Sequence, residues 1–207
     1  MQEELLPLFP LSVVLFPRTS LPLHIFEERY KSMIEAAIRE RSEFGVVLAA
    51  EKGIHNVGCT ATVEEVTQRY PDGRFDIVTR GRRRFEILQV NEEQPCLRAR
   101  VQFFDDEESG APSPEIRQRA LEVYHAIRAV DNSLPEAEAL DPQLSFQLSQ
   151  AIEELDFRQA LLRSRSESER MERLAEYLPL VLARRAAIEQ VKRVAPRNGH
   201  GRHGVKL

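Results

Sequence analysis

The amino-acid sequence predicts an α+β protein in which a β-rich first half, residues 1–108, precedes a helical second half, residues 113–195. Three observations predict this division. Short apolar, β-branched runs between turn signals fill the first half. Helix start signals and helical spacing fill the second. The acidic segment DDEESGAPSP, which contains glycine and proline, reads as an exposed linker between them. The final segment, residues 196–207, is rich in helix breakers and is predicted to be disordered.

The opening stretch, LLPLFPLSVVLFPRTSLPLHIFE, is apolar and punctuated by prolines. Proline lacks a backbone N–H, so this pattern suits short strands with edge or bend positions better than a helix. We predict strands near residues 5–9 and 12–15. Apolar residues at helical spacing then predict one amphipathic helix over residues 27–41. The uninterrupted run FGVVLAA predicts a buried strand packed beneath that helix.

Three or four further strands are predicted between Cys59 and Asp105. The clearest turn signal is Asp72-Gly73, a pair that favours a tight hairpin. A second reversal is predicted just after Val90, where asparagine, glutamates and a proline follow. Many short strands together with one helix indicate a small, partly closed barrel.

Start signals mark the helices of the second half. Ser113 is followed by proline and glutamate, which predicts an N-cap and a first helical turn, and Asp141-Pro142 repeats the signal. Ser166 with Glu169 predicts a capping box that opens a long helix toward residue 194, and Pro179 is expected to kink or divide it. Roughly heptad-spaced apolar residues favour pairing with a second helix, as in a homodimer. They are Met171, Leu174, Leu178, Val181 and Ile188, interrupted by Arg185.

Charge and composition argue against several classes of function. The formal net charge of −4 is unlike a surface that coats nucleic acids or membranes, which needs an excess of lysine and arginine. No stretch approaches the length that spans a bilayer, and the acidic start is unlike a basic signal peptide. Two cysteines cannot form a disulfide framework or a four-cysteine zinc site. We therefore expect a cytoplasmic protein without a membrane partner.

The stretch LPLFPLSVVLFPRTSLPLHIFEERYKSMI resembles the opening of the Lon protease amino-terminal domain family, a proline-punctuated strand pair that leads into a helix. The stretches GCTATVEEV, DGRFDIVTRGRRRFEI and QPCLRARV resemble its later strands, and LDFRQALLRSRSESERMERLAEYL resembles its helical end. The resemblance covers roughly residues 5 to 190. The recurring positions are Gly58, Asp72, Gly73, Gly81, Arg84 and Phe85, whereas Cys96 stands where an aromatic residue is expected.

The resemblance implies a PUA-like β pseudobarrel with one packed helix, followed by an α-helical bundle. In Lon proteases this domain precedes an ATPase and a peptidase, and it helps to engage unfolded or tagged substrates. No G-x-x-x-x-G-K-[ST] phosphate loop occurs in this sequence. The expectation is a stand-alone, non-enzymatic module without a cofactor. It would bind unfolded or flexible polypeptide segments and serve as an adaptor to a protease or chaperone.

Candidate peptide-binding residues lie between the first strands and the first helix. The apolar side chains there outnumber those that a small barrel edge buries, so some are expected to line a groove for extended chains, through side-chain pockets or strand addition. The alternative is that the apolar residues belong to the core and that the polar ones cap the helix. The candidates are Phe16, Leu21, Leu23, His24, Phe26 and Glu27.

An RNA-binding protein is the alternative function, because arginines next to an aromatic residue on a strand resemble some single-stranded nucleic-acid platforms. The candidates are Arg80, Arg82 and Arg84, beside Phe85. Residues alternate faces along a strand, which weighs against a single basic surface. No histidine lies in a spacing typical of a metal site, and no base is placed to activate Ser166 or Ser168. We expect neither a metal nor catalysis.

Overall fold

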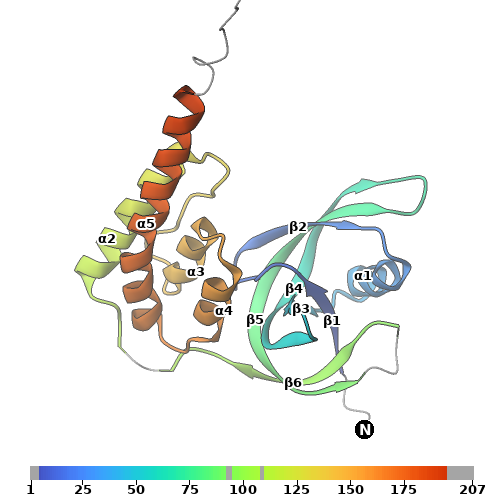
Figure 1. The fold of residues 1–207 in the computed structure, drawn as a ribbon. Helices are drawn as coiled ribbons and strands as arrows, with labels where there is room; N and C mark the ends of the chain where they lie inside the picture. Colours follow the sequence, from blue (N-terminus) through green and yellow to red (C-terminus); the bar gives the residue numbers. More distant parts are fainter. Residues whose placement is uncertain (1–4, 92–94, 108–109, 195–207) are drawn as a thin grey trace, which may run out of the picture.

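The computed structural model describes residues 5–91, 95–107 and 110–194. A barrel part, residues 5–104, lies beside a helical part, residues 114–194 (Figure 1). The barrel part consists of β1 Leu6–Leu11, β2 Ser20–Ile25, α1 Glu28–Glu40, β3 Phe44–Ala49, β4 Ile54–Arg69, β5 Phe75–Asn91 and β6 Arg98–Phe104. The helical part consists of α2 Pro114–Val130, α3 Leu144–Leu148, the 3-10 turn η1 Ser149–Ala151, α4 Leu155–Arg163 and α5 Glu167–Val194.

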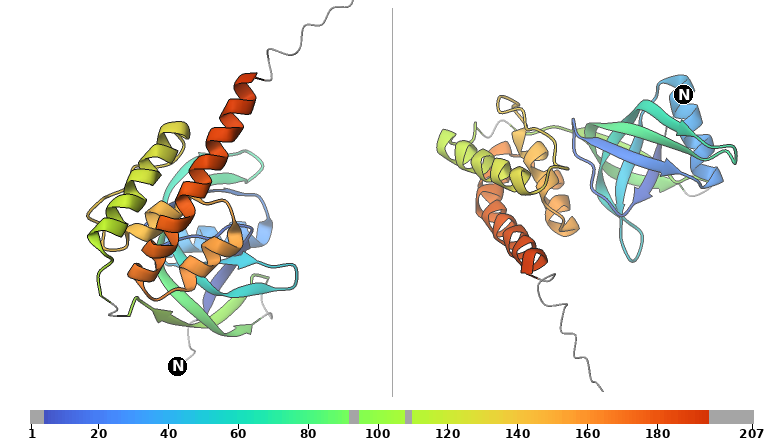
Figure 2. Two further views of the ribbon diagram at one scale, coloured as in Figure 1. Left: turned by 60° about the vertical axis from the view of Figure 1, so that its left-hand side comes forward. Right: turned by 90° about the horizontal axis from the view of Figure 1, so that it is seen from above.

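The six strands form one sheet in the order β2-β5-β4-β3-β1-β6. The sheet closes because β6 pairs with β1 on one side and with β5 on the other. Strands β1 and β3 are parallel, and the other pairs are antiparallel. Helix α1 lies on the side of the barrel away from the helical part, as the right-hand view of Figure 2 also shows. The pattern of strands with one packed helix agrees with the predicted barrel.

Local sequence signals place several elements correctly. The helix predicted over residues 27–41 is confirmed as α1, whose buried face has the spacing of Tyr30, Met33, Ile34 and Ala37. The buried strand predicted beneath it is confirmed as β3. The predicted turn at Asp72-Gly73 joins β4 to β5, and the glycine adopts a φ of 81°, a conformation that strains residues with a Cβ.

The prediction of a second strand over residues 12–15 is wrong. Strand β1 already ends at Leu11, and the next strand is β2, which begins at Ser20. The intervening segment turns toward the helical part, where Phe16 stacks on Phe146 with ring centroids 5.5 Å apart. Arg158 of α4 donates a hydrogen bond to the Val14 carbonyl over 2.8 Å. The apolar run that resembles a strand is therefore an anchor between the two parts.

The helix starts follow the capping signals, with differences in detail. Ser113 caps α2 by accepting from the Ile116 N–H, and Ser166 caps α5 by accepting from the Glu169 N–H. The Glu169 carboxylate instead accepts a hydrogen bond from Ser164, so the capping box is only half formed. Helix α5 continues through Pro179 without division. Within the described ranges, no helix is long and apolar enough to cross a membrane.

Candidate peptide-binding site

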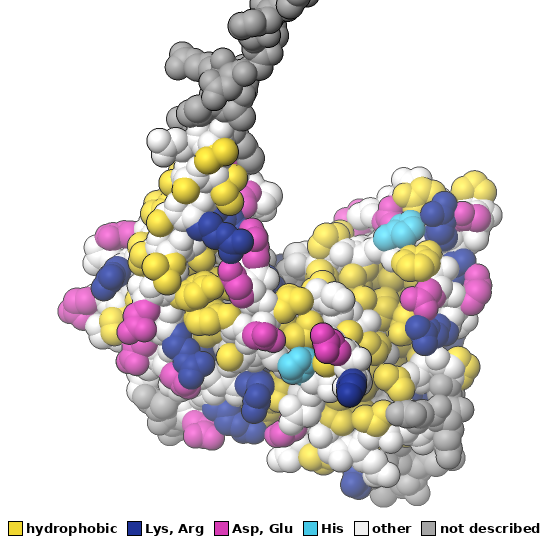
Figure 3. Space-filling view, viewed as in Figure 1, with side chains coloured by type: hydrophobic (Ala, Val, Ile, Leu, Met, Phe, Trp, Pro, Cys, Tyr) yellow, Lys and Arg dark blue, Asp and Glu magenta, His cyan; other side chains and the backbone are white. Residues whose placement is uncertain are grey.

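An open groove lies between β1, β2, the start of α1 and the ends of β4 and β5. We call it the β2 groove, and its volume is about 670 Å³. Its apolar lining comes from segments far apart in sequence, and its rim is polar and aromatic. The lining includes Phe9, Leu11, Leu23, Tyr30, Ile54 and Leu97, and the rim includes His24, Phe26, Glu27 and Arg29. Figure 3 shows hydrophobic side chains gathered around a hollow on the barrel part.

The groove exists because two neighbouring strands do not pair. Strand β2 pairs with β5 alone among the described residues, and β1 pairs with β3 and briefly with β6. The side chains of β2 alternate, so Leu21, Leu23 and Ile25 point inward while Pro22 and His24 are exposed. An apolar surface is thus flanked by two strand edges, as strand addition by an extended chain requires.

The rim carries two hydrogen-bonded polar clusters. His24 Nδ1 lies 2.5 Å from Asp76 Oδ1, and the Tyr70 hydroxyl donates to the other oxygen of Asp76 over 2.7 Å. These bonds, from His24 first and then Tyr70, lower the pKa of Asp76, and the Tyr70 bond raises the pKa of Tyr70. Phe26 stacks on His24 with ring centroids 6.0 Å apart, yet it remains 59% exposed.

The second cluster lies at the start of α1. Glu27 occupies the N-cap position, but its side chain makes no capping hydrogen bond. It instead pairs with Arg29, with Nη2 and Oε2 2.8 Å apart, and this hydrogen bond raises the pKa of Arg29. The Arg29 guanidinium also lies over the Tyr30 ring, 4.6 Å from its centroid. The Glu27 and Arg29 side chains are 42% and 50% exposed, so a ligand at the mouth of the groove can reach both charges.

The structure brings four of the six predicted residues together on this groove, namely Leu23, His24, Phe26 and Glu27. Leu21 is half-buried against the core and does not line the groove. Phe16 was a wrong candidate, because it is fully buried at the junction of the two parts. Sequence reasoning missed Ile54, Val90 and Leu97, which lie in separate segments without a local signal that joins them to β2.

The three arginines of the RNA-binding alternative do not form one surface. Arg82 is exposed, Arg80 lies near Glu64 with Nε and Oε1 3.8 Å apart, and Arg84 is fully buried. The prediction that Arg84 contacts nucleic acid is therefore wrong. Its charge is used inside the protein, at the junction between barrel and helices.

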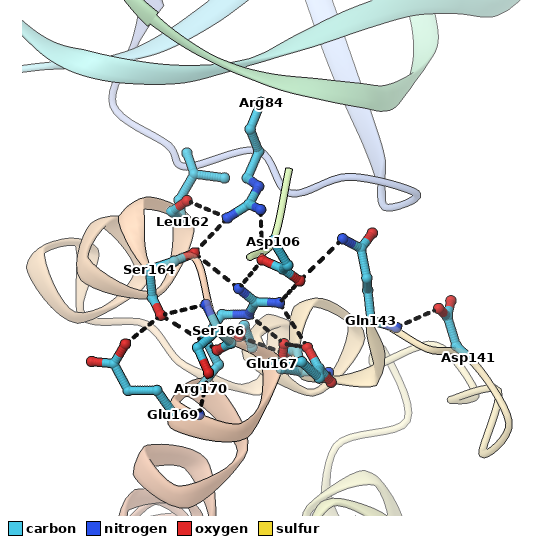
Figure 4. A network of polar contacts seen from close by, with 12 residues as sticks. Arg84, Asp106, Asp141, Gln143, Leu162, Ser164, Ser166, Glu167, Glu169 and Arg170 are labelled. Atoms are coloured by element: carbon cyan, nitrogen blue, oxygen red, sulfur yellow. Dashed lines mark hydrogen bonds and ion pairs between the residues drawn. The ribbon is translucent and has the colours of Figure 1, made fainter. Parts of the chain in front are cut away.

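A buried ion-pair network joins the barrel part to the helical part (Figure 4). Asp106 accepts from Arg84 over 2.6 Å and from two nitrogens of Arg170 over 2.7 and 2.5 Å. Arg84 also donates to the carbonyls of Leu162 and Ser164. Burial raises the pKa of Asp106, but the hydrogen bonds and charges of the two arginines outweigh burial, and its pKa is lowered overall.

Asp106 is an exception within the segment predicted as an exposed acidic linker, whose described residues 105, 107, 110 and 111 are exposed. Asp106 belongs to the segment DDEESGAPSP, yet its side chain is only 19% exposed and bridges two buried arginines. Its neighbour Asp105 is exposed, as a solvated charge run would be. The sequence contains no signal that separates the two aspartates, because their partners are Arg84 on β5 and Arg170 on α5.

No group of three or more histidine, cysteine, aspartate or glutamate side chains capable of holding a metal occurs among the described residues. The arrangement of these residues suits binding: an apolar hollow, two strand edges and a rim of hydrogen-bonding groups. Pockets of this size with few polar groups typically hold a ligand by burial and orient it by hydrogen bonds.

A closed β barrel with one packed helix, followed by a helical bundle, defines a PUA-like barrel protein with an appended helical part. Residues 5–195 match the family model of the ATP-dependent protease La (LON) substrate-binding domain. The chain belongs to this family, and the resemblance predicted from the sequence is confirmed.

Relatives and solved structures agree with this family. The chain is 29% identical over 148 residues to a Lon protease of Anaeromyxobacter dehalogenans, and the match covers 67% of this chain and 17% of that protein. It is 29% identical over 112 residues to a Lon protease of Parabacteroides distasonis, covering 50% of this chain and 14% of that one. The chain thus spans less than a fifth of the length of these relatives.

Two solved structures share the fold. A crystal structure of a Lon N-terminal domain protein from Xanthomonas campestris has a TM-score of 0.67 at 24% identity, covering 84% of this chain and 99% of that one. The N-terminal domain of a Mycobacterium avium complex Lon protease has a TM-score of 0.62 at 18% identity, covering 85% of this chain and 98% of that one. These likenesses support the predicted fold class of a PUA-like barrel with helices.

Proposed function

We propose that this chain is a non-catalytic substrate-recognition module that holds extended, unfolded polypeptide segments in the β2 groove. The observation that carries the proposal is an apolar hollow beside an edge of β2 that pairs with no other described strand, with Phe26 exposed at its mouth. A folded client offers few free strands and apolar side chains together, whereas an unfolded segment offers both. The family match to a substrate-binding domain supports the same function.

Binding would use two kinds of interaction. Apolar side chains of the client enter the hollow beside Leu23 and Tyr30, and their burial is worth roughly 25 cal/mol per Å² before ordering costs. The client backbone pairs with the free edge of β2, which supplies affinity without sequence specificity. The chain would work in the cytoplasm as an adaptor that delivers such segments to a protease or chaperone. Weak contacts without sequence specificity fit this role, because they allow the client to be released to the next protein.

The proposal is tested by fluorescence anisotropy with a labelled, permanently unfolded polypeptide and a labelled RNA oligomer, each at low and high salt. We expect saturable binding of the polypeptide that tolerates salt, and mass spectrometry should show the polypeptide uncut. Binding of RNA alone, lost steeply as salt rises, would instead support the arginine strand, because phosphate contacts release counterions.

Replacing Phe26 by serine should weaken binding of the unfolded polypeptide about tenfold, because an exposed aromatic anchor at a groove mouth typically contributes more than 1 kcal/mol. Phe26 is exposed, so the variant should unfold at the same urea concentration as the parent. Leu140→Ser is the matched control, since Leu140 is 95% exposed and lies outside the groove. If Phe26→Ser and Leu140→Ser bind the unfolded polypeptide with equal affinity, the β2 groove is not the binding site.

A homodimer through α5 is the proposed assembly. Leu180, Ile188 and Val191 are exposed on this helix, whereas Met171, Leu174 and Leu178 are buried within the chain. Sedimentation equilibrium at several concentrations should show a monomer–dimer equilibrium that Val191→Asp shifts toward the monomer. A single monomeric species at every concentration would exclude the dimer.

A further inference from the structure

Strand β2, which flanks the β2 groove, carries a proline in its middle, Pro22. Proline has no backbone N–H, so within sheets it is confined to edge strands, strand starts and bulges. Pro22 nevertheless lies opposite Val78 of β5 in an unbroken antiparallel register that runs from Ser20 to Ile25. The register is unbroken because the neighbours of Pro22 make the hydrogen bonds to β5. The backbone of Pro22 itself then faces the other edge of the strand.

A hydrogen bond at the start of β2 confirms this direction. The Thr19 carbonyl accepts from the Gly81 N–H over 2.9 Å, so the backbone groups of Thr19 face β5. Successive residues of a strand direct their backbone groups to opposite edges. Ser20, Pro22 and His24 therefore direct theirs away from β5. In the part of the chain that the structure describes, no backbone hydrogen bond is made on that edge.

The edge that β2 offers to a client is thus an incomplete ladder. His24 lines the groove and presents both an N–H and a carbonyl. Pro22, two residues earlier, presents a carbonyl alone. A client residue opposite Pro22 can donate its N–H, but its own carbonyl receives no hydrogen bond there, and a polar group buried without a partner costs free energy. Complete pairing is therefore limited to the end of β2 that borders the hollow.

The facing strand, β1, has the same restriction. The Leu8 N–H donates to the Leu97 carbonyl over 2.8 Å, so the backbone of Leu8 points away from β3. Pro10 follows two residues later, so its backbone points to the same side, and it lines the β2 groove without an N–H to offer. Proline on an edge strand is a known device against unwanted strand pairing. Of the two edges, only β2 offers a free N–H at the hollow, that of His24.

We propose that Pro22 limits strand addition in the β2 groove by withholding one N–H from the client backbone. The inference rests on the proposed function and narrows its ligand class. The groove takes short extended segments that pair with β2 at His24 and place apolar side chains in the hollow. A longer run of paired strand adds little affinity, because the ladder is interrupted at Pro22. Bound clients therefore exchange readily, as transfer to another protein requires.

Pro22→Ala tests the proposal because two possible roles of Pro22 predict opposite results. Alanine restores the N–H but removes apolar ring atoms, so a proline that served only as a contact surface would bind less tightly when replaced. The probe is a capped, fluorescein-labelled heptapeptide of alternating valine and threonine with a soluble spacer, followed by fluorescence anisotropy. We expect the variant to bind it about fivefold more tightly than the parent, the gain from one backbone hydrogen bond.

The failure of this inference differs from the failure of the proposed function. If the parent binds the peptide and Pro22→Ala binds it equally or less tightly, Pro22 does not limit strand addition. If neither protein binds the peptide or the unfolded polypeptide, the proposed function is wrong and this inference with it. Pro22 is exposed, and urea denaturation of parent and variant verifies that both are folded.

Pro71→Ala is the matched control, because Pro71 is exposed in the turn between β4 and β5 and does not line the groove. The same chemical change there should leave the affinity unaltered. Two forms of the peptide, N-methylated on the alternate residues of one edge or the other, test whether the gain comes from the backbone. Only the form that keeps its N–H groups on the pairing edge should bind, and it should show the same gain in Pro22→Ala. An equal gain in Pro71→Ala, or with both methylated forms, would overturn the proposal.

Discussion

Asp106→Ala is expected to reduce the free energy of unfolding by about 3–5 kcal/mol, the cost of removing one partner from a buried ion pair. The carboxylate is the shared acceptor of Arg84 and Arg170, and both guanidinium groups are almost inaccessible to water. Without Asp106 two like charges would face each other at the junction of barrel and helices. Urea denaturation followed by circular dichroism gives the free energy of unfolding for parent and variant.

Asp105→Ala is the matched control for this effect. Asp105 is exposed and precedes Asp106 by one residue, so its loss should change the free energy of unfolding by less than about 0.5 kcal/mol. Similar losses in the two variants would mean that the network does not stabilise the junction. If the barrel part and the helical part of Asp106→Ala unfold at different urea concentrations, the network couples the unfolding of the two parts in the parent.

The contribution of Asp106 should also depend on pH. Its pKa is lowered in the folded protein, so its stabilising effect is present above the unfolded value of about 3.9 and is lost as pH falls through the folded value. The difference in unfolding free energy between parent and Asp106→Ala should therefore be constant near neutral pH and shrink in acid. A difference that persists unchanged through the acid range would contradict an ionised Asp106.

Gly81→Ala is expected to cost about 3 kcal/mol, because there is no room for a Cβ at this position. A Cβ built there would lie 2.0 Å from the Phe16 carbonyl oxygen and 2.9 Å from its carbon. The backbone cannot move aside easily, since the Arg18 N–H donates to the Gly81 carbonyl over 2.8 Å and the Gly81 N–H donates to Thr19 over 2.9 Å. Thermal and urea denaturation measure the loss.

Arg82→Ala is the control for Gly81→Ala, because it is the next residue on β5 and its side chain is exposed. Its effect should stay within about 0.5 kcal/mol of the parent. A Gly81→Ala variant as stable as the parent would show that the segment containing Phe16 can be displaced from β5. The lack of space for a Cβ would then not explain why a glycine stands at this recurring position of the family.

The elements whose signals are local were predicted well from the sequence. The 3.6-residue spacing in α1, the apolar run of β3, the turn at Gly73 and the caps at Ser113 and Ser166 all depend on residues within a few positions of each other. Together with the family resemblance they were sufficient for the α+β fold and for the order of its elements. The one strand that was wrongly predicted, over residues 12–15, lies where an apolar run serves instead as an anchor between the two parts.

The amino-acid sequence was sufficient to predict the fold class, the family and the region between the first strands and the first helix from which the groove is built. Which aromatic residue of this region is exposed depends on the three-dimensional packing, because Phe16 is covered by Phe146 from 130 positions away while Phe26 stays exposed. The packing also decided that Asp106 is bound and Asp105 is solvated, and that the arginines near Arg84 serve different roles. The physical reason is that burial and ion pairing depend on contacts between distant segments, which no local spacing records.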